Sequence, residues 1–231
     1  MDSEFLVAGL VWYVVFLLST TCHEAAHAWV AQMGGDHTAA MGGQVSLDPT
    51  PHIRREPFGM VVFPILTYVM GGWMMGWASA PYDPRWAYQY PKRAAVKSLA
   101  GPAANFTLAI LAGLLIHVGI WAGLLRYPES ISFMHVVDAG SAGFSHGVAT
   151  FLSLLFSLNL LLGTFNLLPL PPLDGFGAVP IFLPEDTARR FLEFGWRLGS
   201  FSMLGLLLAW QVFGSMFHPV FEFSLRVLYP G

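Results

Sequence analysis

The sequence predicts an all-α polytopic membrane protein with about 4–6 transmembrane helices. Hydrophobic residues make up 55% of the 231 residues, whereas Asp, Glu, Lys and Arg together make up 11%, against roughly 25% in an ordinary soluble domain. These four charged residue types are absent from five long stretches: 5–23, 57–82, 98–125, 139–173 and 198–221. All but the first exceed the roughly 20 apolar residues with which a helix crosses a bilayer.

The charge balance argues against a nucleic-acid-binding protein. The chain has 11 basic and 14 acidic residues, and no basic stripe is present, so we expect no nucleic-acid partner. Cys22 is the single cysteine and cannot form an intrachain disulfide. The start MDSE is acidic, unlike the basic start of a secretory signal peptide, and we expect none. We expect an integral, multi-pass protein in contact with the lipid bilayer.

The first apolar segment runs from Phe5 to about Met33. It ends at Gly34-Gly35, a glycine pair typical of a helix end. The polar stretch 36–56 follows, rich in Gly, Pro and Asp, and we interpret it as a loop with short strand-like pieces.

The next apolar segment, residues 58–77, is interrupted by proline and glycine at Pro64, Gly71, Gly72 and Gly76. Irregular backbone at membrane depth survives only where protein or a cavity covers it. If this segment crossed the membrane, the Lys and Arg residues of the loops would divide 7 to 4 between the two sides; if it re-enters, they divide 9 to 2. The positive-inside rule favours the second arrangement. We therefore predict a probable re-entrant or β-like element around residues 41–78, with the downstream end of the first helix on the cytoplasmic side.

Three further helices are predicted downstream. The first covers about 94–125 and the second about 143–168. The second ends because proline lacks an amide hydrogen and clashes with the preceding turn, and three prolines follow it: Pro169, Pro171 and Pro172. A polar patch at 185–197 precedes the last predicted helix, at roughly 198–217.

Two carboxylates lie within apolar sequence. Glu24 is inside the first predicted helix, and Asp174 follows the proline break with apolar residues on both sides. A carboxylate at membrane depth is unfavourable by several kcal/mol unless it is paired or coordinated. Each of the two therefore predicts a functional site.

Glu24 belongs to the motif His23-Glu24-Ala25-Ala26-His27. Residues i and i+4 share one face of a helix, so both imidazoles can bind one metal ion while Glu24 holds a water beside it. The alternative is a polar patch at a helix–helix contact. A catalytic zinc site takes three protein ligands and leaves one position open, so the motif predicts a third ligand elsewhere.

Four downstream carboxylates are candidates for this third ligand: Asp36, Asp48, Glu56 and Asp174. Asp48 and Glu56 precede prolines in a polar loop, a setting typical of turns. Asp174 lies in the stretch NLLPLPPLDG, residues 166–175, and its alternative role is the N-cap of the helix after the proline break. Capping and metal binding are compatible, so both roles stay open for Asp174.

HEAAH followed by NLLPLPPLDG resembles the paired signatures of the site-2 protease family, the intramembrane zinc metalloproteases. LDPTPHI (47–53), GWA (76–78) and LAGPAAN (99–105) resemble further segments of that family, in matching order. The resemblance covers about residues 20–180 and implies a minimal member without a PDZ or CBS domain. The chain departs from the family at Ser79, where Lys is usual, and at Phe176, where a second Gly is common.

Residue by residue, the resemblance implies that His23, His27 and Asp174 bind Zn²⁺ and that Glu24 is the catalytic base. Glu24 would take a proton from the water that zinc activates and pass it to the departing amide nitrogen. No internal repeat is evident. We expect a single membrane-embedded metalloprotease domain over 1–231, comprising a catalytic core at about 5–180 and a C-terminal helical segment at about 185–231.

Three asparagines lie in the apolar segments. Asn105 and Asn166 fall within family-like motifs, and we consider them for substrate or oxyanion contact. The alternatives are inter-helix hydrogen bonding for Asn105 and capping of the helix break for Asn166. Asn159 belongs to no motif, and we expect it to serve packing.

The resulting hypothesis is an intramembrane zinc metalloprotease that hydrolyses peptide bonds in or near transmembrane segments of membrane-protein substrates. We expect it in the plasma membrane of a prokaryote, with its active site toward the cytoplasmic side. The substrate must unwind locally and can add as a strand to an edge near 41–78. Two alternatives remain, a metal-binding membrane transporter and a catalytically silent membrane scaffold. Glu24 within the motif and the single ligand cluster favour hydrolysis over transport, and the presence of His23, Glu24, His27 and Asp174 together argues against a silent scaffold.

Overall fold

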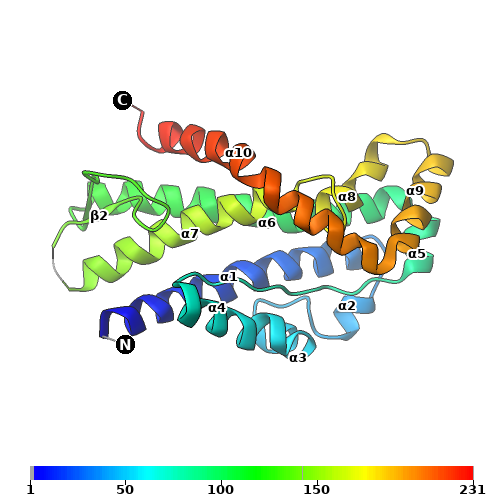
Figure 1. Ribbon diagram of the computed structural model, residues 1–231, viewed down its shortest axis with the longest axis horizontal. Coiled ribbons are helices and arrows are strands. Elements are labelled where there is room, and N and C mark those ends of the chain that lie inside the picture. Colours follow the sequence, from blue (N-terminus) through cyan, green and yellow to red (C-terminus); the bar gives the residue numbers. More distant parts are fainter. Residues whose placement is uncertain (1–2, 142, 231) are drawn as a thin grey trace.

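Four long helices form the body of the protein (Figure 1). They are α1 (Ser3–Met33), α6 (Pro91–Trp121), α7 (Phe144–Asn166) and α10 (Ser202–Leu228). Each is long and apolar enough to cross a membrane. The computed structural model describes residues 3–141 and 143–230. The all-α polytopic fold predicted from the sequence is confirmed.

The central packing unit consists of α1, α6 and α7. Trp12 and Val15 of α1, Ile116 of α6 and Leu154 of α7 have no exposed surface and belong to one apolar cluster. Ala109 and Ala112 are also fully buried in this cluster. Small residues at such positions let membrane helices approach closely. These three helices therefore pack closely around any side chain that points between them.

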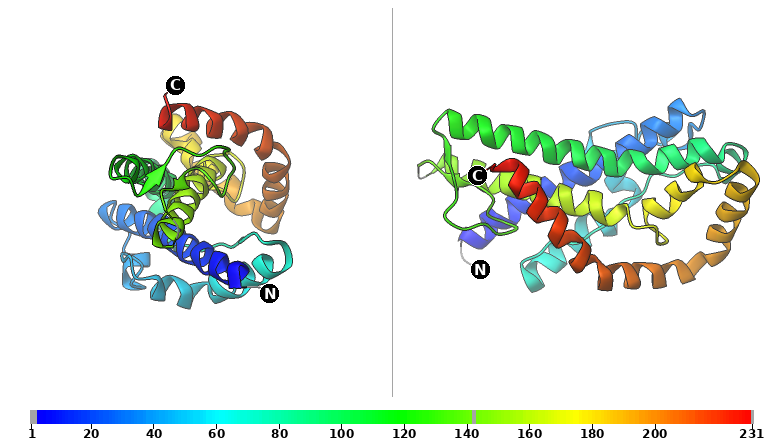
Figure 2. Two further views of the ribbon diagram at one scale, coloured as in Figure 1. Left: turned by 90° about the vertical axis from the view of Figure 1, so that its left-hand side faces the viewer. Right: turned by 90° about the horizontal axis from the view of Figure 1, so that it is seen from above.

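The C-terminal helix differs from its predicted range. It was expected at roughly 198–217, but α10 begins at Ser202 and continues to Leu228, with Pro219 inside it. A proline inside a helix removes one backbone hydrogen bond and bends the axis without always ending the helix. Figure 2 shows that α10 is bent along its length. The polar patch expected before it is a helix of its own, α9 (Glu185–Leu198).

The segment after α1 turns back on itself. Three short helical elements follow α1 and lead into a longer one: α2 (Thr38–Met41), α3 (Pro49–Arg55), the π-helix η1 (Phe58–Val62) and α4 (Phe63–Gly71). Gly72 then adopts a left-handed conformation, with φ of 70°, and ends α4. Extended backbone over residues 73–83 runs back to α5 (Pro84–Gln89), at the end of the bundle where α3 and α4 began (Figure 1). The chain therefore turns back within this segment, as the re-entrant prediction requires, and its position relative to a membrane stays a prediction.

The expected strand-like pieces in residues 36–56 are wrong. Asp48 is instead the N-cap of α3, where its side chain accepts a hydrogen bond from the Thr50 amide at 2.9 Å, and Pro49 occupies the first helical position. Turn and cap residues thus start a helix here. Within residues 3–141 and 143–230, the paired strands are β1 (Leu125–Arg126) and β2 (Asp138–Ala139), which are antiparallel.

Two glycines allow the two arms of the re-entrant hairpin, residues 58–83, to approach closely. A Cβ on Gly59 would overlap the carbonyl oxygen of Trp77, and a Cβ on Gly76 would overlap the carbonyl oxygen of Gly59. The Trp77 amide also donates to the Gly59 carbonyl at 3.2 Å. The extended segment therefore lies directly against the start of the η1–α4 helix.

After α7 the chain forms α8 (Asp174–Ala178), the 3-10 helix η2 (Val179–Phe182), α9 and a second 3-10 helix, η3 (Gly199–Phe201). The two termini lie at the opposite end of the bundle from α9 (Figure 1). Nine of the 11 basic residues belong to the end that holds α3, α5 and α9: Arg54, Arg55, Arg85, Lys92, Arg93, Lys97, Arg189, Arg190 and Arg197. This distribution agrees with the 9-to-2 division predicted for a re-entrant hairpin.

Candidate metal centre

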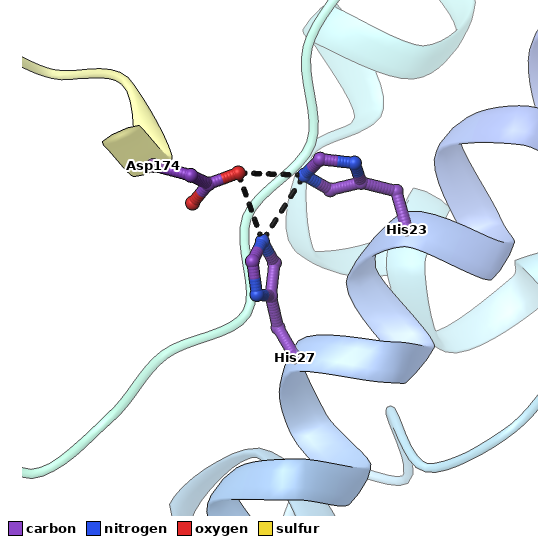
Figure 3. A group of neighbouring side chains, drawn as sticks. All are labelled: His23, His27 and Asp174. Atoms are coloured by element: carbon purple, nitrogen blue, oxygen red, sulfur yellow. Dashed lines mark hydrogen bonds and ion pairs between the residues drawn. The ribbon is translucent and has the colours of Figure 1, made fainter. Parts of the chain in front are cut away.

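Three side chains from two distant parts of the chain meet between α1 and α8 (Figure 3). The Nε2 atoms of His23 and His27, one helical turn apart on α1, are 3.0 Å from each other. Oδ2 of Asp174 lies 3.0 Å from the His23 Nε2 and 3.1 Å from the His27 Nε2. The sequence prediction of which three residues converge is therefore matched by the geometry.

Asp174 reaches this position because the chain turns tightly after α7. Asp174 is the first residue of α8, and the N-cap position belongs to Leu173. Its carboxylate points at the two imidazoles instead, so the capping alternative does not describe it. A Cβ on the following Gly175 would overlap the carbonyl oxygens of Leu167 and Leu168. The glycine after Asp174 is thus required by the turn that delivers the carboxylate.

The three residues fit a metal ion. Their ligand atoms lie within 4.8 Å of one another, and tetrahedral zinc with ligands at about 2.0–2.1 Å would hold neighbouring ligand atoms about 3.3 Å apart. The backbone beside them leaves the required space, because a Cβ on Gly101 of α6 would overlap the Nε2 atoms of both histidines. Two imidazoles and one carboxylate form a donor set typical of catalytic zinc with an open fourth position.

The Nδ1 atom of each histidine has a hydrogen-bond acceptor from α6. His27 Nδ1 lies 2.7 Å from the backbone carbonyl of Lys97, and His23 Nδ1 lies 2.5 Å from Oδ1 of Asn105. A proton on Nδ1 leaves the Nε2 lone pair free for a metal. Both imidazoles are buried and are held in the orientation that metal binding needs.

The carboxylate of Asp174 suits the same role. Its Oδ2 atom faces the Nε2 atoms of both histidines, at 3.0 and 3.1 Å. A carboxylate oxygen at this position can complete the ligand set of a divalent metal.

Glu24 follows His23 on α1 and is also buried. Its Oε2 atom has no hydrogen-bond partner within the described part of the chain. A buried carboxylate oxygen without a partner is unfavourable by itself. Such an atom is available to accept a hydrogen bond from a water molecule.

The other predicted residues lie in different surroundings. Asn105 contacts the outer nitrogen of His23, and its amide group donates to Asn159, so its contacts are those of the inter-helix alternative. Asn166 is the last residue of α7, and its Nδ2 donates to the Leu162 carbonyl at 3.0 Å. Its substrate contact stays a prediction. The remaining ligand candidates, Asp36, Asp48 and Glu56, accept hydrogen bonds elsewhere, from Thr38, Thr50 and Ser79 respectively.

One contributor to the site was missed by the sequence analysis. Asn159, which we expected to serve packing, is completely buried and donates to Ser19 while accepting from Asn105. The available signal was its polar amide inside an apolar helix, the same signal that drew attention to Asn105. The backbone carbonyl of Lys97 could not have been found from the sequence, because every residue carries one.

The comparisons with known proteins agree with this geometry. The model of Peptidase family M50 matches residues 11–206, which include both metal motifs. The Bacillus subtilis protein "Putative zinc metalloprotease YwhC" is 34% identical over 181 residues, covering 78% of this chain and 72% of that protein. The Mycolicibacterium smegmatis protein "Putative zinc metalloprotease Rip2" is 33% identical over 174 residues, covering 75% of this chain and 58% of that protein.

The Mycobacterium tuberculosis (strain H37Rv) protein of the same name is 33% identical over 181 residues, and the chain covers 58% of its length. This chain therefore spans less than two thirds of the Rip2 proteins. No solved structure gives a significant match. Because the family model covers most of the chain and includes the whole metal centre, this protein belongs to peptidase family M50.

Proposed function

We propose that this protein is an intramembrane zinc metalloprotease that hydrolyses peptide bonds in or near the transmembrane segments of membrane-protein substrates. One observation carries the proposal: the two histidines and Glu24 lie inside α1, a helix long and apolar enough to span a membrane, and Asp174 completes the ligand set. The names of the matched relatives as zinc metalloproteases support the choice of metal.

The proposed mechanism assigns each residue one task. His23, His27 and Asp174 hold the metal, which when bound lowers the pKa of a coordinated water and polarises the scissile carbonyl. Oε2 of Glu24, which lacks a protein partner in the described residues, accepts the proton from the attacking water. The same atom then delivers the proton to the departing amide nitrogen, so that one carboxylate acts first as base and then as acid.

The substrate backbone needs a partner once it unwinds. The extended segment at residues 73–83 returns past the metal-binding helix and has no strand paired with it in the described structure. Its backbone can receive an unwound substrate as an added strand, which satisfies the substrate's amides and carbonyls. The re-entrant element would then bind the substrate as well as shape the fold.

The expected orientation follows from the charges. The end of the bundle with nine of the 11 basic residues is the one where α1 ends, and basic loops favour the cytoplasmic side. His23 precedes the end of α1 by ten residues, a rise of about 15 Å. We place the metal within the membrane, in the half nearer the cytoplasm, and expect the prokaryotic plasma membrane as its location.

The transporter and scaffold alternatives lack a supporting observation. A transit path needs successive binding sites, but residues 3–141 and 143–230 contain one group of three or more metal-binding side chains. A silent scaffold needs no unpartnered buried carboxylate, and Glu24 provides one. Hydrolysis accounts for both features.

Glu24→Gln tests the proposal, because glutamine keeps the size of the side chain but cannot accept the proton. We expect cleavage of a single-span substrate by the purified full chain in proteoliposomes to fall at least about 100-fold. Bound zinc, measured by mass spectrometry of the metal, should stay equal to that of the unchanged protein. Substrate cleavage that survives the substitution would contradict the role of Glu24. Zinc flux into the vesicles that is unaffected by it would favour the transporter.

A further inference from the structure

We propose that Asn159 is a positioning residue for the metal centre: through Asn105 it fixes which ring nitrogen of His23 faces the metal. The four residues of this relay come from three helices. Ser19 and His23 lie one turn apart on α1, Asn105 is on α6, and Asn159 is on α7. Ser19, Asn105 and Asn159 each have 0% exposed surface, so no bulk water can replace a lost hydrogen bond.

The relay begins at a group that can only accept. Nδ2 of Asn159 lies 2.8 Å from the Leu155 carbonyl oxygen and 2.8 Å from Oγ of Ser19. A carbonyl oxygen cannot donate, so the amide nitrogen of Asn159 must face Leu155. Oδ1 of Asn159 therefore points the other way, toward α6.

The second amide is oriented by the first. Nδ2 of Asn105 donates to Oδ1 of Asn159 at 2.7 Å, and its contact with the Ser19 carbonyl is longer, at 3.5 Å. Oδ1 of Asn105 is then left to face Nδ1 of His23 at 2.5 Å. An oxygen there requires the proton on Nδ1, so that the Nε2 lone pair points at the metal position.

The two histidine ligands differ in how much support they need. His27 is paired with the backbone carbonyl of Lys97, which can present only an acceptor oxygen. His23 is paired with a side-chain amide, which can present either an oxygen or an NH₂ group. Only the pairing of His23 can fail by a flip of the amide, and Asn159 accepts the shorter of the two hydrogen bonds that oppose this flip.

Asn159→Leu tests the relay, because leucine has a similar shape but cannot hold Asn105. The full chain is purified in detergent, stripped of metal with a chelator and titrated with Co²⁺, whose visible absorption reports its ligands. We expect the Co²⁺ affinity to fall by about 10–100-fold, as for other outer-shell partners of metal-binding histidines. The visible spectrum should change as well.

Ser157→Ala provides the matched control. Ser157 is equally buried on α7, but its hydroxyl has no hydrogen-bond partner within the described residues. Its substitution should leave Co²⁺ affinity and spectrum unchanged. Thermal unfolding of the metal-free proteins shows whether each variant folds. If Asn159→Leu does not fold, Asn159→Ala takes its place, because alanine removes the same acceptor without adding volume.

Asn105→Asp separates a relay from a merely structural role. A carboxylate at position 105 presents an oxygen to His23 in either orientation, but its other oxygen would face the acceptor Oδ1 of Asn159. In this background Asn159→Leu removes that repulsion, so it should not lower Co²⁺ affinity further. The same loss in both backgrounds, or no loss from Asn159→Leu alone, would overturn the relay. The inference rests on the proposed metal site. An unchanged protein that binds no Co²⁺ would overturn that site, whereas equal binding by all variants would overturn the relay alone.

Discussion

Gly101 decides at the scale of a single residue whether the metal centre can exist. It lies on α6 opposite the two histidines, and any side chain there would occupy the space of their Nε2 atoms. A glycine in a helix interior is unfavourable by about 1 kcal/mol relative to alanine. Gly101 therefore destabilises α6 locally, but it leaves the space that the metal centre needs.

Gly101→Ala should accordingly weaken metal binding without unfolding the protein. Overpacking is unfavourable by about 1–3 kcal/mol, so we expect zinc affinity to fall by about 5- to 150-fold. Gly113→Ala on the same helix is the control, since its new Cβ would lie 3.3 Å from the flexible end of Leu228 and would otherwise make ordinary contact with the Phe156 ring, at 3.7 Å. Equal zinc affinity in a competition assay for Gly101→Ala and the unchanged protein would show that the space beside the histidines is not used.

The three residues that converge at the candidate metal centre were predictable from the sequence, but their supports were not. The pairing of His23 with His27 follows from helix periodicity, whereas the choice of Asp174 among the carboxylates drew on its apolar surroundings and on the family resemblance. Asn105 was considered for oxyanion contact, but its amide faces His23 and Asn159. An asparagine in a motif does not reveal which partner it meets, because that depends on how three helices pack.

At the scale of elements, Asp36 clamps the re-entrant hairpin to the end of α1. Its Oδ1 accepts from the Thr38 amide at 2.9 Å and from the Thr38 hydroxyl at 2.5 Å, and its Oδ2 accepts from the Asp83 amide at 2.9 Å. Burial raises the pKa of the Asp36 carboxyl group. These hydrogen bonds and nearby Lys97 together have the larger effect and hold that pKa below its ordinary value of 3.8. The ionised carboxylate thus holds the end of the extended segment in place.

Asp36→Asn should lower the free energy of unfolding by about 2 kcal/mol at neutral pH. One carboxylate oxygen, which accepts a hydrogen bond, is replaced by an NH₂ group that faces an N–H donor. A lowered folded-state pKa contributes stability that is complete above the ordinary pKa and is lost as the pH falls through the lowered value. Thermal unfolding of variant and unchanged protein should therefore converge at strongly acidic pH. Asp186→Asn, at an exposed ion pair with Arg189, should change stability little. Equal unfolding temperatures for Asp36→Asn and the unchanged protein at pH 7 would contradict the clamp.

The re-entrant element was predictable as a turn-back but not as a helix followed by extended backbone. The charge division and the glycines indicated that the chain returns. The strand-like pieces expected within 36–56 are short helices, because Asp48 and Pro49 start a helix as readily as they form a turn. The end of α10 was placed too early because the helix continues through Pro219.

At the scale of the whole molecule, the fold places a hydrophilic reaction centre among membrane-spanning helices. The three residues of the metal centre and Glu24 belong to the later half of α1 and the start of α8, and the extended segment runs toward the end of the bundle that is rich in basic residues. A soluble metalloprotease would not need four helices as long and apolar as those of this protein. We therefore expect the reaction to take place inside the membrane.

The most direct test of that claim is the position of the cut. A single-span substrate is reconstituted with the full chain in proteoliposomes, and the products are mapped by mass spectrometry. We expect one zinc-dependent cut within the spanning segment, in the half nearer the cytoplasm, which disappears on treatment with a chelator. A cut confined to the soluble flanks of the substrate, or one that persists without metal, would contradict the account.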